Sequence, residues 1–548
     1  MKRPSASEMK EKCTSLRAWK LPKQRGALAP AHVWTNRDMD PTPIEEQTWG
    51  IWSIIAYWAT DVMNLAVFQT ASAVLAVGLS WREAIPIMFV GNFVIAIPIV
   101  LNGALGSELH IPFSVAATSS FGYYLRYFPI VSRAILGMFW LGIQSVNGSQ
   151  CITIILRSWA PSYNDIPNHV PESTGITTQG FISFFIFWLV QLPLLLIHPT
   201  KLKPLFWIKM IVVPVSTLAL LGWAVHKAGG GGQIFQQRAT VSGSQYAFLW
   251  LSSMSSVSGV WATLSVNIPD FTRYAKGSKG QFIQLPAMPI IFTLCGAIGI
   301  VTTSAVRVFT GQELWNPLDI ITLWLSYGPG GRAAAFFVAL SWFIGQVGTN
   351  ITANCISAAN DLTVLFPRWI NIRRGCFIAA VISCWALVPW KILASASTFL
   401  AFLGGYAALI GPMAGIMATD YWLVKKQCID LPALYNPAGR YRYTAGCNWR
   451  AVVAFIVPVA PLLPGLALAI SGPAVIHVSS GIANLYTFNW LFGFVTSIFL
   501  YALLNFFFPA KETLIQETVW DLDQVAVERY PRENDVEVVC DSSLSSSK

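Results

Sequence analysis

Charge is scarce in this chain. Only 11% of its 548 residues are Asp, Glu, Lys or Arg, whereas 54% are hydrophobic, and the mean hydropathy is +0.54. Soluble domains carry about 25% charged residues. So few charges cannot cover the surface of a water-soluble protein, and we therefore expect an all-α membrane protein.

The motifs of enzymes and metal sites are also missing. The nine cysteines are scattered, with neither a CxxC pair nor a Cys/His spacing, so we expect reduced thiols packed in the interior and no metal site. No Walker loop, dinucleotide fingerprint or Ser-His-Asp arrangement is found. These gaps disfavour an enzyme and an ATP-driven pump, and we expect no catalytic residue and no bound cofactor.

The first 48 residues contain no apolar stretch of the signal-peptide kind, so we expect the first apolar segment to direct insertion. The net charge of +10 would suit nucleic acid. However, the basic residues lie in short clusters between apolar segments rather than on one polar face. We therefore expect a lipid bilayer, and no nucleic acid, as the partner.

Twelve stretches are apolar enough to cross a hydrocarbon core about 30 Å thick, which needs roughly 20 residues per helix. The expected spans are 49–78, 85–106, 131–158, 181–198, 205–226, 246–266, 286–309, 334–357, 374–391, 395–420, 452–472 and 486–508. They define a transmembrane domain at 49–508, between a tail at 1–48 and a tail at 509–548.

Basic residues are concentrated in the loops that follow even-numbered spans. The odd-numbered loops hold fewer, and segments 159–180 and 471–487 contain neither Lys nor Arg. Because cytosolic loops of membrane proteins are enriched in these residues, we expect both tails in the cytosol.

Polarity inside two spans suggests an internal repeat. The first span carries Asp61 and Asn64, and the sixth carries a serine-rich run at 252–259, so both helices are expected to unwind at mid-membrane. Transporters are often built from inverted repeats whose first helices are broken in this way. The repeats would be about 49–226 and 246–420, followed by two helices at about 452–508.

Asp61 is the only carboxylate well inside an expected span, a position that costs roughly 2.5–3.5 kcal/mol. It has either a functional role, or a local partner such as Asn64 or an aqueous vestibule.

Two spans present polar faces. Trp140, Gln144 and Asn147 share one face of the third span. An indole one turn from two amides suits a flat ligand with alternating N–H and C=O groups. The eighth span carries a second such face, made of Asn350, Asn354 and Ser357, and Thr349 and Thr352 could supply oxygens to a cation. Alternatively, the amides only bond neighbouring helices.

Several segments of the sequence resemble the nucleobase cation symporter-1 family, specifically its fungal Fur-type branch of uracil, uridine and allantoin permeases. The resemblance runs from about residue 36 to 509 and is carried by Trp49-Gly50-Ile51-Trp52, Tyr57-Trp58-Ala59-Thr60-Asp61, the segment 77–83, Asn267-Ile268-Pro269-Asp270-Phe271-Thr272-Arg273-Tyr274 and the segment 371–375. It implies a plasma-membrane symporter with the leucine-transporter type of 5+5 inverted repeat and a nucleobase-like substrate bound between spans 1, 3, 6 and 8.

The resemblance also implies residue roles. It assigns stacking to Trp140 and hydrogen bonding to Gln144 and Asn354. Asn147 and Asn350 remain further substrate-binding candidates because of their places on the two polar faces. Trp261 falls where the bacterial hydantoin member has a second stacking Trp, although many fungal members lack it. Span 10, with Phe402, Gly404 and Gly405, resembles the outer gate of the family.

The cation site of the family maps near Val62, Leu65, Gly345 and Thr349, with Asp61 close by. Gly348 stands where the bacterial pattern has a Ser ligand, which agrees with H+ rather than Na+ coupling. A thiamine or nicotinamide riboside permease remains the alternative within the family. A passive channel or a non-transporting nutrient sensor is the alternative of a different class. The sequence predicts no oligomeric state.

Overall fold

The computed structural model describes residues 19–23, 26, 28–62, 64–197, 203–230, 233–472 and 475–520. Most of the two expected tails, at 1–18 and 521–548, lies outside the described residues. Apart from isolated β-bridges, regular secondary structure in the described part is helical. This confirms the all-α class.

Nine helical segments in the described part are long and apolar enough to cross a membrane, and each overlaps an expected span. They contain α4 (Trp81–Leu109), α6 (Tyr127–Trp159), α7 (Thr178–Leu195), α8 (Lys203–Lys227), α12 (Gln284–Thr310), α14 (Gly328–Thr349) joined to α15 (Ile356–Leu365), α17 (Ala396–Thr419), α19 (Trp449–Val459) joined to α20 (Leu463–Ser471), and α22 (Asn489–Phe507). The first, sixth and ninth expected spans are shorter or interrupted: α2 (Ile51–Val62) with α3 (Leu65–Ala76), α9 (Gly243–Val260) with α10 (Leu264–Asn267) and α11 (Pro269–Thr272), and α16 (Ile372–Val381).

The first span breaks where the sequence predicts. Asn64 has extended backbone and caps α3, because its side-chain oxygen accepts from the Val67 N–H at 3.1 Å. Its amide nitrogen donates to the carbonyl of Asp61 at 2.5 Å. A capping side chain of this kind satisfies N–H groups that the start of a helix leaves free. The break thus leaves Asp61 at the end of α2, in the interior.

The sixth span breaks later than expected. The serine-rich run remains helical within α9, since the hydroxyls of Ser256 and Ser258 donate to carbonyls four residues earlier. The helix ends instead at Val260, and the chain turns through 261–263. Just before the turn, Gly259 allows a close approach to α17. A Cβ there would lie 2.3 Å from the carbonyl oxygen of Leu403.

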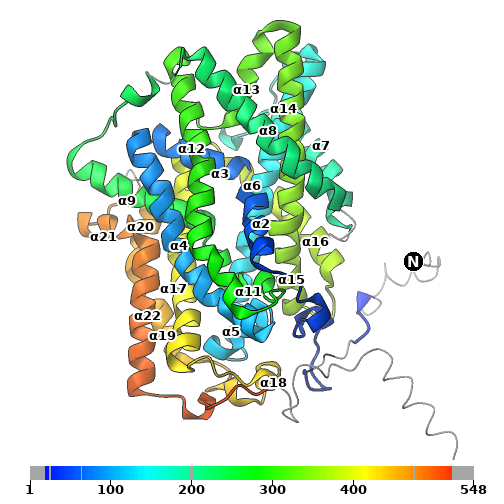
Figure 1. Ribbon diagram of the computed structural model, residues 1–548, viewed down its shortest axis with the longest axis vertical. Helices are drawn as coiled ribbons and strands as arrows, with labels where there is room; N and C mark the ends of the chain where they lie inside the picture. The colour runs from blue at the N-terminus through cyan, green and yellow to red at the C-terminus, as the bar shows by residue number, and fades with distance from the viewer. Residues whose placement is uncertain are drawn as a thin grey trace, which may run out of the picture.

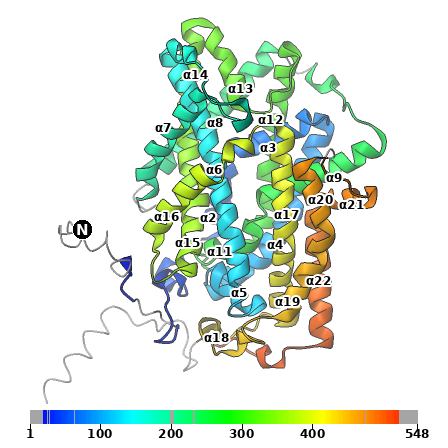
Figure 2. The same ribbon diagram turned by 180° about the vertical axis from the view of Figure 1, so that it is seen from behind.

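Two short helices have no counterpart among the predicted spans. α5 (Phe113–Phe121) follows α4 at one end of the helical bundle, and α13 (Pro317–Thr322) follows α12 at the other end (Figure 1, Figure 2). They occupy corresponding places after the second helix of each repeat. Their opposite placement, together with the two broken helices, fits the 5+5 inverted repeat.

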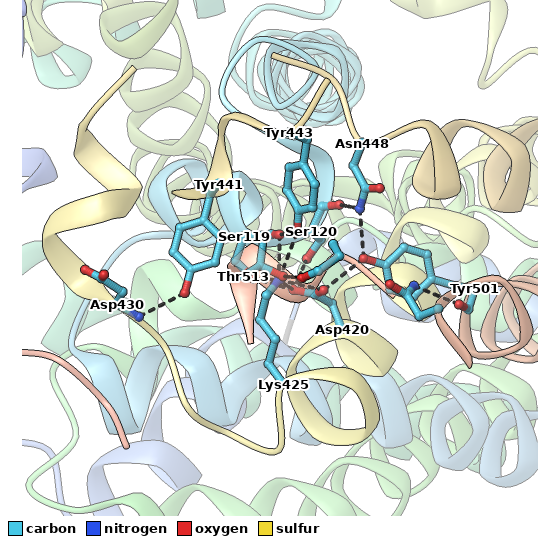
Figure 3. A network of polar contacts seen from close by, with 12 residues as sticks. Ser119, Ser120, Asp420, Lys425, Asp430, Tyr441, Tyr443, Asn448, Tyr501 and Thr513 are labelled. Carbon is cyan, nitrogen blue, oxygen red and sulfur yellow. Dashed lines mark hydrogen bonds and ion pairs between the residues drawn. The ribbon is translucent and has the colours of Figure 1, made fainter. Parts of the chain in front are cut away.

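A buried ion pair anchors the end of α17 (Figure 3). The side chains of Asp420 and Lys425 are 1% and 0% exposed and lie 2.6 Å apart. Lys425 also donates to the Ser119 carbonyl of α5 at 2.7 Å, and Tyr501 of α22 donates to Asp420 at 2.8 Å. A cation suits the carboxyl end of a helix, where carbonyls lack partners. The pair therefore joins α5, α17 and α22.

Candidate functional site

The two helix breaks meet α6 and a π-helical turn (Asn350–Cys355) around a cavity. The expected spans 1, 3, 6 and 8 therefore come together here. The lining residues are Asp61, Asn64, Ala66, Arg133, Gly137, Trp140, Gln144, Val260, Trp261, Thr263, Leu264, Asn267, Thr349, Ala353, Asn354 and Ser357.

Trp140 forms an aromatic wall of this cavity. Its indole N–H donates to the hydroxyl of Tyr406 at 3.2 Å, and the Tyr406 hydroxyl donates in turn to the carbonyl of Gly259. The ring of Phe402 packs edge-on against Trp140, with centroids 6.4 Å apart. These contacts fix the indole and join α6, α9 and α17 beside the cavity.

Of the gate residues expected on α17, Phe402 therefore contacts a cavity residue, whereas Gly404 and Gly405 lie away from the lining. A Cβ at Gly404 would meet Ser256 at 3.5 Å, an ordinary contact. Tyr406 was not singled out in the sequence, although it directly follows this glycine pair.

Gln144 and Asn354 both line the cavity and both present acceptor oxygens. Gln144 is 2% exposed, and its buried Oε1 has no hydrogen-bond partner among the described residues. The amide nitrogen of Asn354 donates to Asn350 at 3.0 Å, which leaves its Oδ1 for another donor. An unpaired buried acceptor costs about 1–3 kcal/mol. A ligand with N–H groups would satisfy these oxygens.

Asn350 and Asn147 do not line the cavity. Asn350 donates to Ser145 and Gln191, and thus orients Asn354 from behind. Asn147 exchanges two hydrogen bonds with Gln69, at 2.9 and 3.1 Å. These two residues therefore make hydrogen bonds between helices, which is the alternative to ligand binding that the sequence left open.

Trp261 lines the cavity at the turn that follows α9. Its ring packs against Trp58 and Phe292, with centroids 5.5 and 4.7 Å apart. The indole thus belongs to an aromatic cluster and contributes part of the cavity wall.

A lysine of the expected fifth span occupies the expected cation region. Lys209 of α8 is 4% exposed; its ammonium lies 3.6 Å from the Asp61 carboxylate and donates to the Thr349 hydroxyl at 2.9 Å. The sequence does contain a sign of this buried lysine, because Lys209 falls within the expected span 205–226.

Of the other residues in the expected cation region, Gly348 lies against this lysine. Gly348 is the residue that gives Lys209 room, since a Cβ would lie 2.9 Å from the lysine Cδ. Gly345 faces Val213 of the same helix, and Val62 and Leu65 are buried at the first helix break. The region therefore holds a tethered ammonium.

A third buried ion pair corrects the view that Asp61 is the only carboxylate well inside a span. The helical segment of the eighth expected span continues to Leu365, beyond the expected end at 357. Asp361 therefore lies within this segment, and it is 1% exposed. Asp361 pairs with Arg133, whose guanidinium also donates to Ser357 at the cavity wall. The expected end at 357 leaves Asp361 outside the eighth span, whereas Arg133 falls within the expected span 131–158.

Comparison with known proteins agrees with this site. A family model described as permease for cytosine/purines, uracil, thiamine, allantoin matches residues 41–493. The chain is 37% identical to an uncharacterized permease of Schizosaccharomyces pombe, covering 93% of this chain and 89% of the relative. It is 33% identical to the allantoin permease of Saccharomyces cerevisiae, over 93% and 83% of the two chains.

The fold is similar to that of Mhp1, a nucleobase-cation-symport-1 family transporter. The closed conformation with bromovinylhydantoin bound has a TM-score of 0.69 at 22% identity, over 90% of this chain and 99% of Mhp1. The inward-facing conformation has a TM-score of 0.72. The curated relatives are transporters rather than enzymes. This chain therefore belongs to the nucleobase-cation-symport-1 family, the permeases for cytosine/purines, uracil, thiamine and allantoin.

Proposed function

We propose that this permease imports a small, flat heterocycle of the uracil, allantoin or uridine kind. The observation that carries the proposal is the pair of acceptor oxygens, on Gln144 and Asn354, that lie in one cavity with the indole of Trp140. The N–H groups of such a ring donate to these oxygens, and its face packs on the indole. Allantoin and hydantoins, the ligands named for the two relatives, carry the same alternation of N–H and C=O groups.

A proton is the proposed coupling ion. The ammonium of Lys209 lies between Asp61 and Thr349, where the family resemblance maps a cation site. The Lys209 ammonium balances the charge of the Asp61 carboxylate without Na+. Because the lysine is covalently attached, it can lose and regain a proton but cannot leave the site as a Na+ ion would. Protonation from outside and release inside would then accompany each cycle of alternating access.

The plasma membrane, with both termini in the cytosol, is the proposed location. The described ends of the chain lie at the same end of the bundle, near α5 and α18 (Leu431–Tyr435) (Figure 1). The basic loops counted in the sequence belong to that end by the positive-inside rule.

A thiamine-type permease is the alternative within the family, because thiamine is among the substrates in the family description. The cavity argues against a permanently cationic ligand. Its two nearby carboxylates, Asp61 and Asp361, are already paired with Lys209 and Arg133. Neither acid is left to balance a ligand cation.

Uptake in cells without nucleobase permeases of their own tests the proposal. Labelled uracil, allantoin and uridine are each offered alone and with an excess of the other unlabelled rings, thiamine or nicotinamide riboside, with and without an uncoupler. We expect the labelled ring to accumulate and the uncoupler to abolish this accumulation. An unlabelled neutral ring should compete for uptake, whereas thiamine should not. Equilibration without accumulation would indicate a passive channel, and absence of any uptake would indicate a sensor.

A further inference from the structure

A second cavity lies between the carboxyl-terminal half of α6, the start of α7, the helix α13 and the turn that follows Pro389–Lys391. It shares no lining residue with the central cavity. Its polar lining residues are Ser149, Gln150, Thr153, Arg157, Thr177, Gln179, Asp319 and Thr322. Because α13 lies at the end of the bundle opposite α18, this cavity belongs to the outer end in the proposed orientation (Figure 1, Figure 2).

The outer cavity continues from the central one along α6. Its lining begins at Val146, two positions after Gln144, and extends to Arg157, thirteen positions after Gln144, which corresponds to about 20 Å along a helix. A chain of amides lies between them. Gln69, which is bonded to Asn147, donates to Asn316 at 3.2 Å, and Asn316 donates to Gln150 at 2.9 Å.

Two charged groups in the outer cavity have bonding capacity left. Arg157 donates to Gln179 at 2.6 Å, but its buried Nε has no partner among the described residues. A guanidinium carries five N–H donors, and no second hydrogen bond joins those of Arg157 to a described residue, so the accessible ones can donate to a ligand. Asp319 is exposed as a residue, and no hydrogen bond or ion pair joins its carboxylate to another described residue. One donor group and one acceptor group thus line the same recess.

This pair selects a ligand by its charge and hydrogen-bonding pattern. A carboxylate ligand would be attracted by Arg157 but repelled by Asp319, and an organic cation would meet the reverse. A neutral ring with a carbonyl on one edge and an N–H on another complements both groups. Apolar side chains of Ile154, Leu318 and Trp390 supply walls for the ring.

We propose that the outer cavity is a second binding site, in which a neutral heterocycle is held by Arg157 and Asp319 before it enters the central cavity. This inference rests on the proposed function, because the ligand class is the same. It makes Arg157 and Asp319 recognition residues that act upstream of Trp140, Gln144 and Asn354.

Cysteine protection on intact cells tests the outer site. Thr322→Cys places a thiol in its lining, and a membrane-impermeant methanethiosulfonate reports access to that thiol. Uracil, allantoin and uridine are each added, and the unmodified chain corrects for native cysteines. The transported ring is expected to slow labelling about tenfold at ten times its half-protecting concentration. Protection should persist with the same half-protecting concentration in Trp140→Ala, which weakens binding in the central site.

Arg157→Gln and Asp319→Asn should each abolish this protection, whereas Glu172→Gln, an exposed acid outside the lining, should leave it unchanged. Asp319→Asn should still fold, because the Asp319 side chain has no partner among the described residues that the substitution would remove. Loss of protection in this variant would therefore not be due to misfolding. Equal labelling with and without a ring that is transported would overturn the outer site alone, as would protection that Trp140→Ala removes. If no ring is transported and none protects, the proposed function fails as well.

Discussion

At the scale of single residues, Trp140 is held in place by contacts that leave it in the cavity wall. Aromatic contacts contribute about 0.5–1.5 kcal/mol beyond the burial of area, so Trp140→Phe should weaken apparent affinity by about tenfold or less. Trp140→Ala loses the burial as well and should weaken it further. Trp159→Ala serves as the control, because Trp159 is on the same helix and 81% exposed. Concentration dependence of uptake, corrected for surface expression, measures both effects; unchanged affinity in Trp140→Ala would place the stacking surface elsewhere.

Lys209 carries the coupling proposal. Without its ammonium, the charge of Asp61 is left unbalanced in the interior, and no group remains to exchange the proton. We expect Lys209→Met to lose accumulation against a gradient while it retains more of its exchange of internal for external substrate. Lys227→Met, at the exposed end of the same helix, should accumulate normally. Accumulation by Lys209→Met that still collapses with an uncoupler would contradict a role for this lysine.

The sequence was informative about residues that act through their own helix. The face shared by Trp140 and Gln144 follows from helical spacing, and both residues line the cavity. Asn147 has the same spacing but bonds Gln69, which lies 78 positions away. Pairs such as Lys209 with Asp61 and Arg133 with Asp361 depend on which helices are neighbours. Spacing within one helix carries no information about such neighbours.

At the scale of elements, the apolar spans could be predicted because hydrocarbon thickness sets their length. The short helices α5 and α13 could not, since neither forms a long apolar run. The break at Asn64 was predictable from a capping residue in an apolar segment. The break after Val260 was not predictable. Serines whose hydroxyls donate to carbonyls of their own helix are compatible with a continuous helix, so the serine-rich run does not mark where the helix ends.

The anchor between α5, α17 and α22 should contribute strongly to stability. Removing one partner of a buried ion pair typically costs 3–5 kcal/mol, because the other charge is left unpaired. We therefore expect Lys425→Met to lower the melting temperature of the purified protein clearly, and Lys425→Met with Asp420→Asn to lower it less. The pair of Arg440 and Asp430, whose side chains are 34% and 13% exposed, is the control, since pairs nearer the surface contribute about 0–1 kcal/mol. Equal effects of Lys425→Met and Arg440→Gln would show that the buried pair is not an anchor.

At the scale of the whole molecule, orientation decides which cavity faces which compartment. Segment 161–178 precedes α7, contains neither Lys nor Arg, and is largely exposed. An epitope inserted there should be labelled by antibody on intact cells, whereas tags at either terminus should be labelled only after permeabilisation. The reverse pattern would invert the topology and place the outer cavity on the cytosolic side.

The central claim is that the side-chain oxygens of Gln144 and Asn354 accept hydrogen bonds from the N–H groups of a flat ring. Inhibition constants of uracil and its two N-methyl derivatives against uptake are measured in the wild type, in Gln144→Ala, and in Gln237→Ala, whose amide bonds Ser304 outside the cavity lining. An acceptor left unpaired costs about 1–3 kcal/mol, so one methylation should weaken wild-type affinity by about tenfold.

In Gln144→Ala the same methylation should cost much less affinity, since the acceptor is gone, and in Gln237→Ala it should cost as much as in the wild type. Asn354→Ala should show the same loss of discrimination for a ring nitrogen. If all variants rank the three rings with the wild-type ratios, neither amide contacts the substrate, and the central claim is wrong.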